Sequence, residues 1–212
     1  MMKQNDISTK IISAIEREEI DDKVKKYISE ADKFLFNIDK NTIKPDFIDD
    51  FLDKTKNILI STVNGCIKSR NNPKKKDDLK KYKEGYFNEI IQNANDIVLY
   101  SGIENPTIEI ECKKADNIYE IICSYPDKGF SLKDIYGFCS RGNSNKSSES
   151  GQEGMYGIGI KSLFCFATYF CIENNIKIEI DSNEGVLDNI KIDCLNICPQ
   201  KTKLKLRFEY NE

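Results

Sequence analysis

Three oxygen-bearing side chains lie along residues 86–100 at a spacing that a helix would bring to one side. Glu89, Asn93 and Asp96 occupy positions i, i+4 and i+7, so successive steps of 100° place them within one arc. Carboxylate and amide oxygens can bind a hard cation or orient a water molecule. The same pattern is typical of a surface helix with a solvated polar face, so the spacing alone leaves both interpretations open.

The chain contains no histidine, which excludes several kinds of catalysis. Ser–His–Asp and Cys–His mechanisms both need an imidazole, so any proton transfer must use carboxylates, lysines, tyrosines or water. The eight cysteines include no pair with the two-residue gap of a zinc knuckle, and a structural zinc site is not expected. Several lie in apolar runs and the N-terminal residues lack a signal-peptide pattern. We therefore expect reduced, buried thiols rather than a disulfide framework.

Two glycine-bearing segments follow the candidate helix. Asp127 and Gly129 belong to the segment 125–130 that follows the apolar run 119–124, in a pattern that is also a common turn. Glycine at this point would let the main chain approach a bound group closely.

The second segment has three glycines ahead of a lysine: Gly154, Gly157, Gly159 and Lys161. Main-chain N–H groups at the start of a helix attract anions, so this segment could bind phosphate. The first and last glycine have the spacing of a P-loop. However, one residue separates the last glycine from the lysine, and a polar segment precedes them instead of a buried strand, so we exclude a P-loop.

The string Glu-Ile-Ile-Gln-Asn-Ala-Asn-Asp at 89–96 resembles the N-box of the GHKL superfamily, which includes gyrase, heat-shock chaperone, histidine kinase and mismatch-repair ATPases. The resemblance implies ATP and Mg²⁺ as cofactors. It also implies that Glu89 activates the attacking water, that the side-chain oxygen of Asn93 holds Mg²⁺, and that Asp96 belongs to the same site.

The two glycine segments resemble the other boxes of this superfamily, in the same order along the chain. The resemblance implies that Asp127 binds the adenine amino group, that Thr202 supports this aspartate, and that residues 140–153 form a lid over ATP. The remaining residues that it assigns to the nucleotide are Gly129, Gly154, Gly157, Gly159 and Lys161. Together with the string at 157–164, these motifs are most similar to sacsin-like ATPases, although Phe130 stands where many relatives have a further glycine.

Hydrophobic periodicity gives the elements that must position these residues. It predicts helices over 24–35, 48–66, 86–100 and 132–138, and a polar loop at 69–83. It predicts strands over 107–112 and 119–124. At the C-terminal end it predicts an antiparallel meander of strands 177–181, 189–194 and 203–210. With the resemblance, the expected fold is α+β: a Bergerat-type two-layer sandwich whose mixed, mostly antiparallel sheet is covered by helices. The expected domains are an N-terminal helical extension with its polar loop (1–83) and an ATP-binding domain (84–212).

Composition limits the partners. Lysine and arginine total 32 against 35 acidic residues, a net charge of −3, which does not favour nucleic acid as the main ligand. No apolar run reaches the length of a membrane span, and we expect a cytoplasmic protein. The expected partners are ATP or ADP, with a second copy or another protein contacting the N-terminal helices.

The function expected first is Mg²⁺-dependent ATP binding with slow hydrolysis. A nucleotide-gated interaction module is the alternative, because relatives that couple ATP to mechanical work carry a following domain that supplies a cation to the γ-phosphate, whereas this chain stops at residue 212. A protein kinase acting on a partner and a structural domain without nucleotide stay open.

Overall fold

The computed structural model describes residues 4–37, 42–70, 76–140, 163–183, 186–195 and 200–209. Within these ranges the α-helices are α1 (Gln4–Arg17), α2 (Asp22–Leu35), α3 (Ile48–Arg70), α4 (Lys76–Ser101) and α5 (Leu132–Cys139), followed by the short 3₁₀ helix η2 (Leu163–Cys165). The strands are β1 (Glu109–Ala115), β2 (Ile118–Pro126), β3 (Tyr169–Glu173), β4 (Ile176–Asn183), β5 (Val186–Cys194) and β6 (Lys201–Glu209). Among the described residues, no helix is both long enough and apolar enough to cross a membrane.

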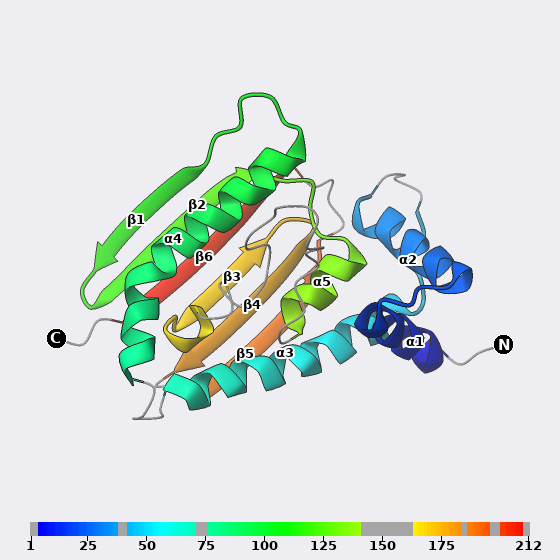
Figure 1. Cartoon of the computed structure of the whole chain (residues 1–212), viewed down its shortest axis with the longest axis horizontal. Helices are drawn as coiled ribbons and strands as arrows, with labels where there is room; N and C mark the ends of the chain where they lie inside the picture. The colour runs from blue at the N-terminus through cyan, green and yellow to red at the C-terminus, as the bar shows by residue number, and fades with distance from the viewer. Residues whose placement is uncertain are drawn as a thin grey trace.

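The six strands form one sheet in the order β1-β2-β6-β3-β4-β5, and each neighbouring pair is antiparallel. Helices α3, α4 and α5 lie across one face of this sheet, while α1 and α2 pack at the end of α3 and against α5 (Figure 1). β6 shows the alternation that this arrangement requires: Thr202, Leu204 and Leu206 are buried, and Lys201 and Lys203 are exposed. The predicted α+β class, with helices covering a largely antiparallel sheet, is confirmed.

An aromatic cluster fills the space between the sheet and the helices. The ring of Phe164 lies 5.1 Å from that of Phe170 and 6.1 Å from that of Phe138, both in edge-to-face geometry. Phe138 and Phe170 are at most 1% exposed. Such pairs add stabilisation beyond the burial of their apolar area, and here they fix α5 and η2 over β3.

The predicted C-terminal meander is wrong in one respect. β4 and β5 are neighbours, but β6 lies between β2 and β3 instead of beside β5. The prediction also lacked β3, because the apolar run that leads into this strand has no alternation that would separate turn from strand. Without that strand, the place of β6 in the sheet could not be inferred.

The predicted polar loop 69–83 is also partly wrong, since α4 begins at Lys76. Lysine and glutamate have good helix propensity, so a polar segment can continue a helix without an apolar face.

The thiols meet the expectation only in part. Cys123, Cys139 and Cys171 are free and buried, whereas the free thiols of Cys66 and Cys194 are partly exposed and that of Cys112 on β1 is exposed. Burial raises the pKa of the Cys123 thiol to about 11, which keeps it protonated and unreactive.

Hydrogen bonds join the N-terminal helices to α5. The main-chain N–H of Leu132 donates to the Asp32 carboxylate at 2.8 Å, and the Tyr136 hydroxyl donates to Glu16 at 2.7 Å. Thr62 on α3 donates to the carbonyl of Cys139 at 3.0 Å. Buried apolar residues of α1, α2 and α3 belong to the same core cluster as those of the sheet. The division at residues 83 and 84 remains a prediction.

Asn175, in the turn between β3 and β4, is the connector whose loss we expect to be most damaging. Its amide donates to the carbonyls of Phe130 (2.9 Å) and Leu35 (3.1 Å) and accepts from the N–H of Phe130 (2.8 Å). Asn175→Ala leaves three buried main-chain groups without these partners, so we expect a loss of about 3–5 kcal/mol in the free energy of unfolding, measured by urea denaturation. Asn189→Ala, at an exposed position on β5, is the matched control, and equal losses in the two variants would contradict this role.

Candidate functional site

α4 turns part of its polar side toward the protein interior. Asn93 is only 4% exposed, and Glu89 and Asp96 are half-buried. The solvated side of the helix instead carries Asn88, Gln92, Asn95 and Leu99. Ile90, Ala94 and Ile97 anchor the buried side, and α4 packs against β2 (Figure 1). A solvated polar face is therefore excluded for Asn93.

The two ends of the Asn93 amide have different surroundings. Its nitrogen donates to the main-chain carbonyl of Glu89 at 2.6 Å, whereas its buried oxygen has no hydrogen-bond partner among the described residues. A buried acceptor without a partner costs about 1–3 kcal/mol. Because the nitrogen is used within the helix, the oxygen is the atom available to a ligand, and amide oxygens are ligands that Mg²⁺ accepts.

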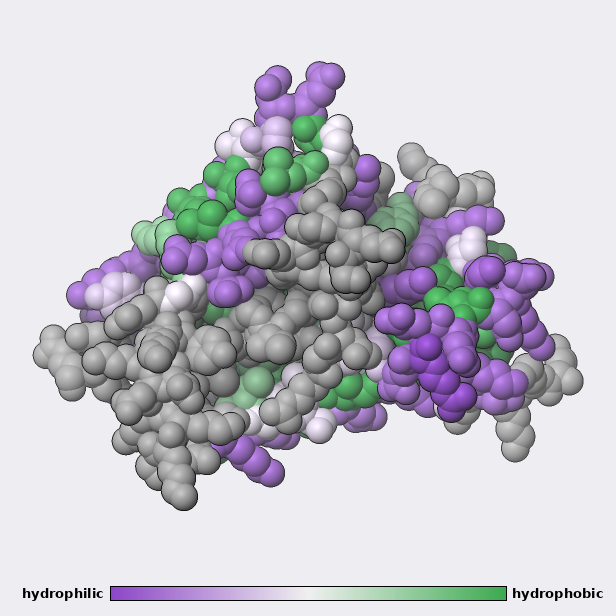
Figure 2. All heavy atoms as spheres, viewed as in Figure 1, coloured by the Kyte–Doolittle hydropathy of each residue, from purple (hydrophilic) through white to green (hydrophobic). Residues whose placement is uncertain are grey.

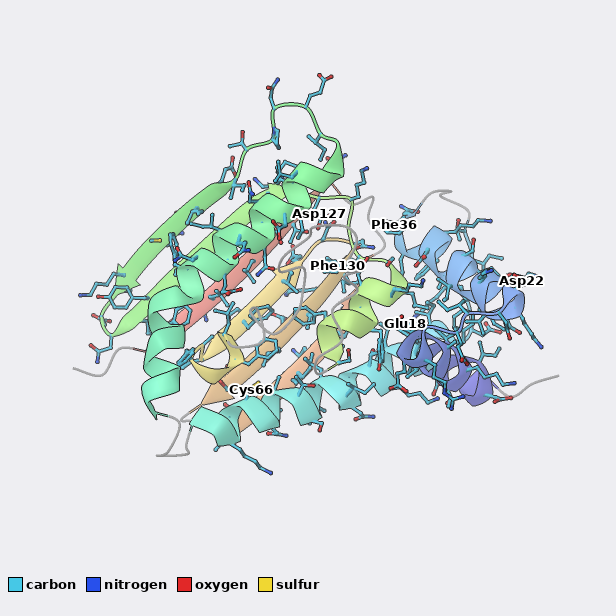
Figure 3. The ribbon with its side chains drawn as sticks, in the orientation of Figure 1. Glu18, Asp22, Phe36, Cys66, Asp127 and Phe130 are labelled. Atoms are coloured by element: carbon cyan, nitrogen blue, oxygen red, sulfur yellow. The ribbon has the colours of Figure 1, made fainter. Side chains whose placement is uncertain are left out.

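Asp127 lies directly after β2 (Figure 3). Its carboxylate is buried and has a donor on each oxygen. The Thr202 hydroxyl donates to Oδ2 at 2.5 Å, and the N–H of Gly129 donates to Oδ1 at 3.2 Å. Burial raises the pKa of Asp127, while these two hydrogen bonds act in the opposite direction. The structure thus brings Asp127, Gly129 and Thr202 together.

The register of β2 and β6 explains why Thr202 lies beside Asp127. Thr202 on β6 is the partner of Tyr125 on β2, two residues before Asp127. The N–H of Asp127 also donates to the carbonyl of Gln200, which continues the contact beyond the ladder. Gly129 adopts φ +91°, a left-handed conformation that side chains disfavour, so glycine is required for the turn that returns its N–H to the carboxylate.

Two site residues were missed from the sequence: Asn174 and Asn175. Asn174 donates to the Thr202 hydroxyl at 2.9 Å, which orients this hydroxyl toward Asp127. Asn175 holds both main-chain groups of Phe130, the residue that departs from the family pattern. An Asn-Asn pair between two apolar strands is typical of an exposed hairpin turn, so this pattern could not predict that both side chains are at most 2% exposed.

Two groups of predicted site residues lie outside the described residues. They are the phosphate-binding residues Gly154, Gly157, Gly159 and Lys161, and residues 141–153 of the predicted lid.

α5 leads directly to the segment of the predicted lid. Ser131 and Asp134 form a capping box at its start, and Tyr136 and Cys139 are tied to the N-terminal helices and α3. In the part of the chain that is described, no group of three or more His, Cys, Asp or Glu residues could hold a metal ion. A cation here would need oxygens from a ligand as well as from the protein.

No family model matches the chain, and no curated protein matches it. Among solved structures, the ATPase region of topoisomerase II from Saccharomyces cerevisiae is similar at 18% identity and a TM-score of 0.38, over 57% of this chain and 36% of that one. The same region bound to ICRF-187 (dexrazoxane) gives the same values. This chain thus spans about a third of the structures it matches. The low TM-score gives no basis for assigning function, which must come from the residues of this chain.

Substitution of Thr202 tests the buried carboxylate. Thr202→Val removes the hydroxyl that stabilises the charged form, so we expect the pKa of Asp127 to rise further, as measured by NMR titration of its carboxyl carbon. An acid whose pKa is higher in the folded than in the unfolded protein binds its proton more tightly when folded. Stability then falls as the pH rises from the unfolded value of about 3.9 through the folded pKa, and stays lower above it.

We therefore expect the stability deficit of Thr202→Val to grow with pH across this window. Thr202→Ser retains the donor and should titrate like the wild type. A deficit independent of pH would show that the valine acts through packing alone.

Proposed function

We propose that this chain is a Mg²⁺-dependent ATP-binding domain of the GHKL type, similar to sacsin-like ATPases, that hydrolyses ATP slowly. The observation that supports this most directly is the buried oxygen of Asn93. Burying an amide oxygen without a partner is unfavourable, and a ligand that supplies a cation to it would remove this cost. The helix that carries Asn93 also carries a half-buried carboxylate one turn away, Glu89.

Asn93 would hold the metal together with nucleotide phosphate oxygens and water. Mg²⁺ usually keeps several waters and takes only one or two protein oxygens, which suits a region whose described residues include no cluster of three or more metal-binding side chains. When bound, the ion neutralises charge on the phosphates. The bond from the Asn93 nitrogen to the Glu89 carbonyl fixes the amide plane, so the oxygen is already oriented.

Asp127 would recognise the adenine amino group. Each carboxylate oxygen can accept two hydrogen bonds, which makes four positions, and the donors to Asp127 are the Thr202 hydroxyl and the main-chain N–H groups of Gly129 and Lys128. The carboxylate therefore has capacity for an N–H donor from a ligand. Its fixed orientation would favour a base that presents an amino group over one that presents a carbonyl.

Glu89 would orient the water that attacks the γ-phosphate. Without histidine in the chain, a carboxylate beside the metal ligand is the suitable base. Gly154, Gly157 and Gly159 would contribute main-chain N–H groups to the phosphates, Lys161 would contribute charge, and Asp96 would complete the polar side of α4.

One observation favours a nucleotide-gated interaction module as the second candidate. α5 leads to the predicted lid, and it is hydrogen-bonded to α1 and α2 through Glu16 and Asp32. A change in the lid on nucleotide binding would therefore reach the N-terminal helices directly. In this second candidate function, ATP binding controls whether a partner or a second copy binds to the N-terminal helices, and hydrolysis is negligible.

Adenine recognition is tested by Asp127→Asn. The amide places an N–H₂ group where the carboxylate accepts, so we expect ATP affinity to fall at least about tenfold in isothermal titration calorimetry with Mg²⁺. Asp116→Asn, in the exposed turn between β1 and β2, should bind like the wild type. Equal ATP affinities in the two variants would show that Asp127 does not bind the nucleotide.

Hydrolysis is tested by Glu89→Ala. We expect ATP binding to be retained and phosphate release to fall by about 10²–10⁴-fold, the usual contribution of a general base. Asn88→Ala, on the exposed side of the same helix, is the control. If the wild type releases phosphate faster than a solution of ATP alone, an equal rate in Glu89→Ala would refute the role of Glu89. A wild-type rate no higher than that of ATP alone would instead favour the interaction module.

A further inference from the structure

β1 is an edge strand of the sheet. All seven of its residues, Glu109 to Ala115, are exposed, and it pairs only with β2 on its inner side. Among the described residues no strand pairs with its outer side (Figure 1). Such an edge presents unpaired main-chain N–H and C=O groups, and proteins usually shield it or use it for pairing with another chain.

The charges along β1 divide it into two halves. Glu109 and Glu111 precede Cys112, and Lys113 and Lys114 follow it. The outer members of this set are held within the chain, since Glu109 forms an ion pair with Lys201 and Lys114 lies over the Tyr119 ring at 5.3 Å. Glu111 and Lys113 form an ion pair with one another on the strand surface, at 3.1 Å, and each side chain is more than half exposed.

We propose that β1 pairs antiparallel with β1 of a second copy, with Cys112 facing Cys112 of the other copy across a twofold axis. In this register Glu111 of each copy lies opposite Lys113 of the other. Because Glu111 and Lys113 also lie on the same face of one strand, the four charges alternate in sign around a square. Opposite charges across an antiparallel pair stabilise it, and one symmetric axis produces both contacts.

The neighbouring registers are less favourable. In an antiparallel pair of identical strands related by a twofold axis normal to the sheet, the axis passes between one residue and the same residue of the other copy. Each possible register is therefore defined by the residue that lies at the axis. Centring on Glu111 places two carboxylates in contact, and centring on Lys113 places two ammonium groups in contact. The Cys112-centred register therefore satisfies both central charges without a like-charged pair.

Apolar surface beside β1 adds to the interface. Figure 2 shows hydrophobic residues gathered along the margin formed by α4 and β1, and the exposed large ones there include Leu99, Ile103 and Ile110. Pairing at β1 would bring these margins of two copies close together and remove apolar area from water. This surface is distinct from the N-terminal helices, whose buried apolar residues already pack within the chain.

Charge reversal tests the pairing in the full chain. We expect sedimentation equilibrium over a concentration series to show a dimer, and Glu111→Lys or Lys113→Glu to weaken it at least about tenfold by placing like charges opposite one another. The double variant, Glu111→Lys with Lys113→Glu, restores opposite charges and should restore the dimer. Circular dichroism checks that each variant is folded. A monomer at every concentration, or a dimer that the single reversals leave unchanged, overturns the proposal.

The register is tested at Cys112. In a paired strand the two Cα atoms would be about 4.5–5.5 Å apart, within reach of mild oxidation or a short bismaleimide. We expect a cross-linked dimer that disappears in Cys112→Ser. Lys191→Glu, on the strand at the opposite edge of the sheet, is the control and should leave both readouts unchanged. A dimer that does not cross-link through Cys112, or one that Lys191→Glu disrupts, contradicts this interface.

Discussion

The buried carboxylate of Asp127 sets the main constraint on this fold. A carboxylate that is largely shielded from water needs hydrogen-bond donors, and those of Asp127 come from β6 and from the glycine turn after β2. Thr202 can reach it only if β6 lies beside β2. Asn174 can reach Thr202 only if the β3–β4 turn lies on the other side of β6. The strand order β2-β6-β3 is thus the arrangement that satisfies this one group.

The same end of the sheet holds the N-terminal helices in place. Asn175 joins the loop at Phe130 to the end of α2 at Leu35, and Asp32 accepts from the first N–H of α5. Burial raises the pKa of Asp32, and this hydrogen bond offsets part of that effect. The polar groups that position the candidate adenine site are therefore continuous with those that attach α2.

Much of the fold and of the candidate site could be predicted from the sequence, and the predictions that were wrong or missing have a common cause. Periodicity located α4, most strands and the helix after Gly129, because these are local patterns. The order of the strands and the burial of Asn174 depend on contacts between distant segments, which periodicity does not encode. Asn93 shows the limit within one helix: the spacing identified a polar side, but only packing against β2 determined which part of it faces inward.

The oxygen of Asn93 has a consequence for thermal behaviour. While it has no partner among the described residues, it costs the fold about 1–3 kcal/mol. A ligand bound to it as we propose would recover this cost, so the melting temperature of the domain would rise with the concentration of that ligand.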